Sequence, residues 1–185
     1  MTATCMDTPK RYGAVTRTLH WLMAALFVWQ FTSVLAHAFA EDGALDSFLW
    51  PTHKSVGTLL MLLILVRILW ALANTGRRPA PVSLPARLGH GVLYLLMLFI
   101  PLVALLRQFG GGRAFSPFGI PFMPGFEGEK ITWMVDLGSN FHSLMGWILL
   151  AAIVGHVVAA FWHYFAGQPN VMRRIIGRPD DNPQA

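Results

Sequence analysis

The sequence predicts an all-α integral membrane protein built as a bundle of four spanning helices. Of its 185 residues, 55% are hydrophobic and 12% are charged, and the mean hydropathy is +0.51, which is too apolar for an ordinary soluble domain. A spanning helix needs about 20 mainly apolar residues. Short loops leave no room for a second domain, so we expect a single membrane domain over residues 1–185. Four stretches meet the length requirement: residues 18–39, 55–73, 88–106 and 137–167.

The first stretch, residues 18–39, has an alternative interpretation as a cleaved signal peptide. Basic residues precede it, and Ala-Phe-Ala at residues 38–40 follows it like a cleavage site. The apolar region of a signal peptide is about 7–15 residues long. This stretch is longer and contains His20 and two tryptophans, so we expect an uncleaved span.

Basic residues set the expected orientation, because cytoplasmic loops collect Lys and Arg. The termini and the connection between the second and third spans carry Lys10, Arg11, Arg17, Arg77, Arg78, Arg87, Arg173, Arg174 and Arg178. The opposite connections mix four basic residues with six acidic ones: Lys54, Arg107, Arg113, Lys130, Glu41, Asp42, Asp46, Glu127, Glu129 and Asp136. We therefore expect both termini in the cytoplasm. The net charge of +5 belongs to this topology, so no nucleic-acid partner is expected.

Histidines inside the spans are functional candidates, because an imidazole costs free energy in hydrocarbon. His142 and His156 are 14 residues apart, which is nearly four helical turns, so both project from almost the same face. A rise of about 1.5 Å per residue separates them by roughly 21 Å. In hydrocarbon about 30 Å thick, His142 then lies near the outer boundary and His156 near the inner one.

Two histidines of the first two spans lie at matching depths. His20 is near the cytoplasmic start of the first span, and His53 is at the outer start of the second. We therefore expect His20 to meet His156 and His53 to meet His142. Two histidines fill both axial positions of a heme iron, which favours electron transfer over oxygen binding at the metal. The bundle is thus expected to enclose two b-type hemes.

The single cysteine of the chain limits the kinds of cofactor site that it can form. Cys5 is alone, which excludes an intrachain disulfide and a Cys-x-x-Cys-His attachment site. Thiolate clusters for zinc or iron–sulfur centres are excluded as well. Any heme must be held non-covalently. A lone histidine in an apolar helix is more often a packing residue, so a metal-binding or transport bundle without heme remains an alternative.

The other three histidines have different interpretations. His37 is 17 residues from His20, about 100° away around the helix, so we interpret it as an interfacial histidine. His90 and His163 lie at the cytoplasmic ends of the third and fourth spans. His163 is roughly 10 Å closer to the cytoplasm than His156. It suits proton handling and, next to Trp162 and Tyr164, equally suits interface anchoring.

Small residues and one cation accompany the histidines. Gly57, Gly146 and Gly155 would let a flat porphyrin approach, although small residues also pack helices without heme. Arg67, within the second span, has two interpretations: it pairs with a heme propionate or it snorkels to the nearby interface.

Residues 107–136 form the expected outer loop. The three glycines at 110–112 are not a phosphate-binding loop, because no Gly-Lys-Ser/Thr sequence follows them, and we interpret them as a hinge. Five aromatic residues after the hinge suit an interfacial segment or a lid over the outer heme: Phe115, Phe118, Phe122, Phe126 and Trp133.

Four segments carry a resemblance to the bacterial cytochrome b561 family, and it covers nearly the whole chain. They are YGAVTRTLHW at residues 12–21, THKSVG at 52–57, LGHGVLYLLM at 88–97 and FHSLMGWILLAAIVGHVVAAFWHYF at 141–165. The resemblance implies a four-helix protein of the bacterial cytoplasmic (inner) membrane with two b-type hemes. It implies His20, His53, His142 and His156 as heme ligands, and it matches His90 and His163 to positions near a quinone pocket.

The resemblance also implies an activity: oxidation of superoxide to oxygen on the periplasmic face and reduction of ubiquinone. A surface that collects superoxide should be cationic, whereas the outer connections carry four basic and six acidic residues. The acidic outer rim instead favours docking of a basic redox protein. The alternative function is therefore an electron-relay cytochrome b subunit that serves a partner dehydrogenase or a periplasmic cytochrome.

Overall fold

The structure, a computed structural model, describes residues 5–166 and 170–177, and its regular elements are all helices. No strand occurs in these residues, only two isolated bridges, Thr8 with Arg11 and Phe115 with Met123. The elements in chain order are α1 (Ala14–Phe39), α2 (Ala44–Leu49), η1 (Trp50–Thr52), α3 (His53–Ala73), α4 (Leu84–Gly110), η2 (Pro117–Gly119), α5 (Thr132–Phe165) and α6 (Asn170–Ile176).

Four helices are long and apolar enough to cross a membrane, which confirms the predicted all-α fold with four spans. They are Ala14–Phe39, Ala44–Ala73, Leu84–Gly110 and Thr132–Phe165. The helices extend beyond the apolar stretches because backbone hydrogen bonds continue into polar flanks. The largest difference is in the second span, where α2 and η1 precede α3. The predicted end of the fourth span, residue 167, lies outside the described residues.

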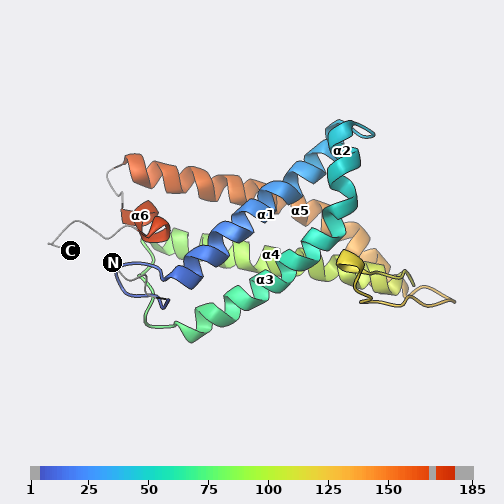
Figure 1. Cartoon of the computed structure of the whole chain (residues 1–185), viewed down its shortest axis with the longest axis horizontal. Helices are drawn as coiled ribbons and strands as arrows, with labels where there is room; N and C mark the ends of the chain where they lie inside the picture. The colour runs from blue at the N-terminus through green and yellow to red at the C-terminus, as the bar shows by residue number, and fades with distance from the viewer. Residues whose placement is uncertain (1–4, 167–169, 178–185) are drawn as a thin grey trace.

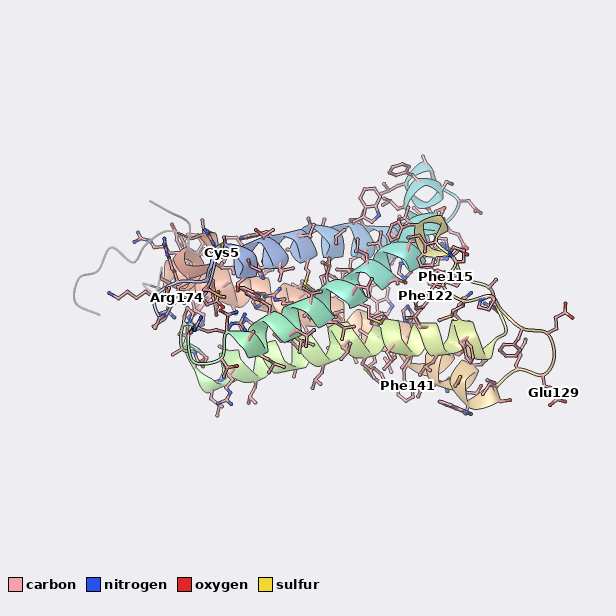
Figure 2. All side chains as sticks on the ribbon, turned by 60° about the horizontal axis from the view of Figure 1, so that its bottom comes forward. Cys5, Phe115, Phe122, Glu129, Phe141 and Arg174 are labelled. Carbon is pink, nitrogen blue, oxygen red and sulfur yellow. The ribbon has the colours of Figure 1, made fainter. Side chains whose placement is uncertain are left out.

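The long helices run between two ends of the molecule (Figure 1). The start of α1, the α3–α4 connection and α6 lie at one end, which we call the α6 end. α2, η2 and the loop before α5 lie at the other, which we call the α2 end. Figure 2 shows Cys5 and Arg174 at the α6 end and Phe115, Phe122 and Glu129 toward the α2 end.

Two small clusters of buried side chains hold the spans together. Met23 of α1 packs against Val56, Leu60 and Ile64 of α3. The second cluster joins α4 and α5 through Leu93, Ile100 and Leu149. Most other large apolar side chains are exposed, as expected for helices whose outer faces contact lipid tails as apolar as themselves.

A buried carboxylate, Asp7, ties the start of α1 to the end of α3. Its Oδ1 accepts hydrogen bonds from the Gly13 amide at 2.8 Å and the Thr16 hydroxyl at 2.7 Å. Its Oδ2 accepts from Arg78 Nε at 2.9 Å. Trp70 of α3 donates its indole N–H to the Thr16 hydroxyl at 2.9 Å. We call Asp7, its three partners Gly13, Thr16 and Arg78, and Trp70 the Asp7 clasp; it sets the register of α1 against α3.

Candidate functional site

His20 and His156 lie together near the α6 end. His20 projects from α1 and His156 from α5, both rings are partly buried, and their centroids are 6.5 Å apart at an interplanar angle of 68°. His90 of α4 also contacts this pair, with its ring centroid 5.1 Å from that of His156. We call His20 and His156 the inner pair.

Arg67 of α3 is directed at the inner pair from within its span. Its Nη2 lies 3.2 Å from His20 Nδ1, and its Nε donates to the Tyr94 hydroxyl at 3.1 Å. Across residues 5–166 and 170–177, no ion pair joins Arg67 to a carboxylate. A guanidinium at this depth favours an anion beside the inner pair, because charge in a low-dielectric region needs a counter-charge.

His53 and His142 lie together nearer the α2 end. His53 is the first residue of α3, His142 projects from α5, and their ring centroids are 6.2 Å apart at an interplanar angle of 84°. We call them the outer pair. His142 Nδ1 lies 3.1 Å from the backbone carbonyl oxygen of Ile100. Donation of the Nδ1 proton to this carbonyl leaves the lone pair of Nε2 free, as a metal-ligating histidine requires.

Gln30 of α1 is a second neighbour of the outer pair, and the sequence did not indicate it. Its amide nitrogen lies 3.1 Å from His53 Nδ1 and donates to the His53 carbonyl at 3.1 Å. Its amide oxygen is buried and lacks a hydrogen-bond partner. Gln30 is a polar residue one helical turn from apolar Leu26. Its local sequence does not predict the contact with His53, because His53 is on another helix.

His37 takes part in a separate stack at the α2 end. Its ring is parallel to that of Trp50, with centroids 3.8 Å apart at 9°, and its Nδ1 lies 3.2 Å from the buried carboxylate of Asp46. The Trp50 ring is in turn 4.9 Å from that of His53. Trp50 therefore contacts both His37 and His53 of the outer pair.

His163, which the sequence predicts together with His90 for a quinone or proton site, lies in the final turns of α5 and is partly buried. Among the described ring contacts, His90 touches the inner pair and His163 does not. Of the two residues predicted for a quinone or proton site, the structure therefore brings only His90 into contact with the inner pair.

Both histidine pairs fit axial ligation of a heme iron. A metal–imidazole bond is about 2 Å and the ring centroid lies about 1 Å behind the nitrogen, so two imidazoles on one metal have centroids about 6 Å apart. The observed values are 6.5 and 6.2 Å. A Cβ added to Gly146, one turn after His142, or to Gly155, next to His156, would meet no atom within 4 Å, so there is open space at these two glycines. Gly57 differs, because the Gln30 amide lies 3.3 Å from an added Cβ.

The outer loop lies against the start of α3, close to the outer pair. Phe115 and Met123 pair through their backbones, and the Phe118 amide lies 3.4 Å from the Ser55 hydroxyl, two residues after His53. Across residues 5–166 and 170–177, no three His, Cys, Asp or Glu side chains gather closely enough to hold a metal ion by themselves.

Four apolar spans with a histidine pair toward each end define a membrane electron-transfer protein. The chain belongs to the prokaryotic cytochrome b561 family, whose family model matches residues 11–178. It is 28% identical to "Cytochrome b561 homolog 2" of Escherichia coli (strain K12) over 93% of this chain and 94% of that relative. It is 26% identical to "Probable superoxide oxidase CybB" of Yersinia pestis over 90% of this chain and 96% of that relative. Membership implies b-type heme and redox exchange within a lipid bilayer.

Proposed function

We propose that this protein takes single electrons from superoxide at the α2 end and delivers them to ubiquinone at the α6 end. Two non-covalent b-type hemes would be held by the inner pair, His20 and His156, and the outer pair, His53 and His142. The observation that carries the proposal is the spacing of these pairs, 6.5 and 6.2 Å between ring centroids, toward opposite ends of one helix, α5. In this orientation the α6 end, with both termini, faces the cytoplasm of a bacterial inner membrane.

The proposed reaction balances as two one-electron oxidations and one two-electron reduction. Each superoxide anion loses one electron and becomes oxygen. Ubiquinone gains two electrons and two protons and becomes ubiquinol, so two superoxide anions are consumed for each quinol. When bound, the hemes supply one-electron carriers at the two depths.

The chain itself supplies orientation, charge and protons. Ile100 accepts the Nδ1 proton of His142 and so fixes the ring that faces His53. Arg67 supplies the counter-charge for a heme propionate at the inner pair. His90 is exposed, and its Nδ1 lies 2.6 Å from the Ala86 carbonyl, which leaves Nε2 free to pass protons toward quinone. We assign His163 to the same quinone site, one step closer to the cytoplasm.

The identity of the proposed substrate is supported by the name of one relative, a probable superoxide oxidase. Its test is superoxide consumption by the purified protein with and without a soluble ubiquinone analogue. We expect consumption in the presence of quinone, with one quinol formed for two superoxide anions. Heme reduction that is indifferent to superoxide would reject this substrate.

A second candidate function is electron relay to a partner protein, and exposed acids at the α2 end favour it. Glu41, Asp42, Glu127, Glu129 and Asp136 are all exposed, so they can meet a basic periplasmic partner. Heme reduction that requires an added partner would favour relay. Full quinone-dependent activity of the isolated protein would exclude it.

A further inference from the structure

A hollow between α1 and α6 lies at the α6 end, and neither histidine pair lines it. Its volume is about 480 Å³. The wall from α1 is formed by Ala14, Arg17, Thr18, Trp21 and Leu22, which follow one side of the helix because Ala14 and Thr18, Arg17 and Trp21, and Thr18 and Leu22 are each four residues apart. The wall from α6 is Ile175 and Ile176. Arg17 and Thr18 are therefore the polar part of the α1 wall, one turn after Ala14, and Trp21 and Leu22 line the hollow a helical turn deeper in the span.

Hydrogen bonds from α1 to the end of α6 hold the two walls in place. The Trp21 indole N–H donates to the Ile175 carbonyl at 3.3 Å, and Arg17 Nη1 donates to the Ile176 carbonyl at 3.0 Å. These carbonyls come from the last turn of α6, where no further helical amide is available. Gly177 then leaves the helix at φ 88°, and a Cβ there would collide with the Arg17 guanidinium. The hollow is thus a built feature rather than a chance gap.

Arg17 has hydrogen-bonding capacity left over. A guanidinium presents five N–H donors, and the bond from Nη1 to the Ile176 carbonyl uses one of them. The Thr18 hydroxyl, exposed on the next position of the same face, adds a further donor. A phosphate group matches these donors, because it offers several anionic oxygens to one planar guanidinium.

The deeper half of the hollow suits hydrocarbon. Trp21 and Leu22, on this deeper turn, have exposed fractions of 49% and 46%, and the exposed fraction of Ile176, on the facing wall at the level of Arg17, is 48%. Tryptophan is typical of the boundary between headgroups and acyl chains. A ligand with a phosphate at one end and acyl chains at the other matches both halves.

Charge at the α6 end selects an anionic ligand. Eight basic residues lie there in the described segments: Lys10, Arg11, Arg17, Arg77, Arg78, Arg87, Arg173 and Arg174. The described acid at this end is Asp7, which the clasp already binds to Arg78. We propose that the hollow between α1 and α6 binds an anionic phospholipid, with its phosphate on Arg17 and Thr18 and its acyl chains along Trp21, Leu22 and Ile176. This site is independent of the proposed redox function.

The test is thermal unfolding of the full chain in detergent with added lipid. Phosphatidylglycerol at about 100 times its Kd should raise Tm by about 5–10 °C, and phosphatidylcholine should raise it by less than half as much. Arg17→Gln should lose the phosphatidylglycerol shift. Arg87→Gln, which removes an exposed charge at the same end but outside the hollow, should keep it.

Arg17 also holds α6, so a second variant separates lipid binding from folding. Thr18→Glu places a carboxylate beside the phosphate position without removing the Arg17–Ile176 hydrogen bond, and Thr18→Gln is its uncharged match. We expect the lipid shift in Thr18→Gln and its loss in Thr18→Glu. Equal shifts in these two variants would overturn the site. An equal Tm shift with inorganic phosphate would also overturn the site. A Tm shift that ubiquinone produces and that Arg17→Gln loses would overturn it as well, because the occupant would then be a quinone.

Discussion

Heme counts in paired histidine variants test the ligand assignment most directly. His142 and His156 are 14 residues apart on one continuous helix, which separates them by roughly 21 Å. Sites more than about 10 Å apart without shared partners behave additively. Members of one pair share a single site instead, since their ring centroids are only 6.5 and 6.2 Å apart.

The expected heme counts follow from this geometry. Each single variant, His142→Ala or His156→Ala, should lower the count of six-coordinate hemes from about two to about one per chain. The double variant across pairs, His142→Ala with His156→Ala, should retain none. The double variant within the inner pair, His20→Ala with His156→Ala, should still retain about one, because both changes remove the same site.

The assay is a pyridine hemochrome measurement per polypeptide, combined with carbon monoxide binding to the reduced protein. Carbon monoxide identifies a heme that has kept only one histidine, so such a heme is not counted as six-coordinate. His163→Ala is the matched control on the same helix and should keep both hemes. Retention of a six-coordinate heme in the double variant across pairs would refute the assignment, as would loss of both in the double variant within the pair.

Three other changes test the surroundings of the pairs. Arg67→Gln should lower the midpoint potential of the inner heme by roughly several tens of millivolts and leave the potential of the outer heme unchanged, because a nearby cation favours the reduced form. A redox titration in which the outer potential changes more than the inner one would contradict this. Asp7→Ala should destabilise the fold by about 3–5 kcal/mol, since it breaks a buried ion pair and leaves the Gly13 amide and Thr16 hydroxyl without an acceptor. Its Tm should fall by about 10 °C, whereas exposed Glu129→Gln should change little. Gly155→Leu should reduce heme content and leave the circular dichroism spectrum unchanged, because the space at Gly155 is open to a leucine side chain, which would then occupy the place of a heme. Full heme content in this variant would exclude a macrocycle there.

Helical periodicity explains why the spans and the meeting of the histidines could be predicted from the sequence. An apolar stretch long enough to cross a membrane has one stable backbone conformation, the helix. Two residues 14 positions apart on it then have a fixed separation and direction. His142 and His156 were located in this way, and depth matching placed His20 and His53 opposite them, as the ring distances show.

Contacts between distant segments could not be predicted in the same way. Asp7 and Arg78 are separated by 71 positions, and no local pattern relates them. The short helix α2 was missed because residues 44–49 carry an acid and follow a glycine turn, which is typical of a loop. His37 was placed at the interface, yet its stacking on Trp50 depends on how α2 and η1 fold back toward α1.

The charges beside the two pairs bear on the direction of electron transfer in the proposed function. Arg67 lies beside the inner pair, so its positive charge would favour the reduced form of a heme held there. Near the outer pair, the buried Asp46 carboxylate acts on the His37–Trp50 stack that contacts His53. Lys54 follows His53 but is exposed, so water and salt screen its charge. In the proposed function this asymmetry would make a heme held by the inner pair the better electron acceptor, so electrons that enter at the α2 end would move toward the α6 end.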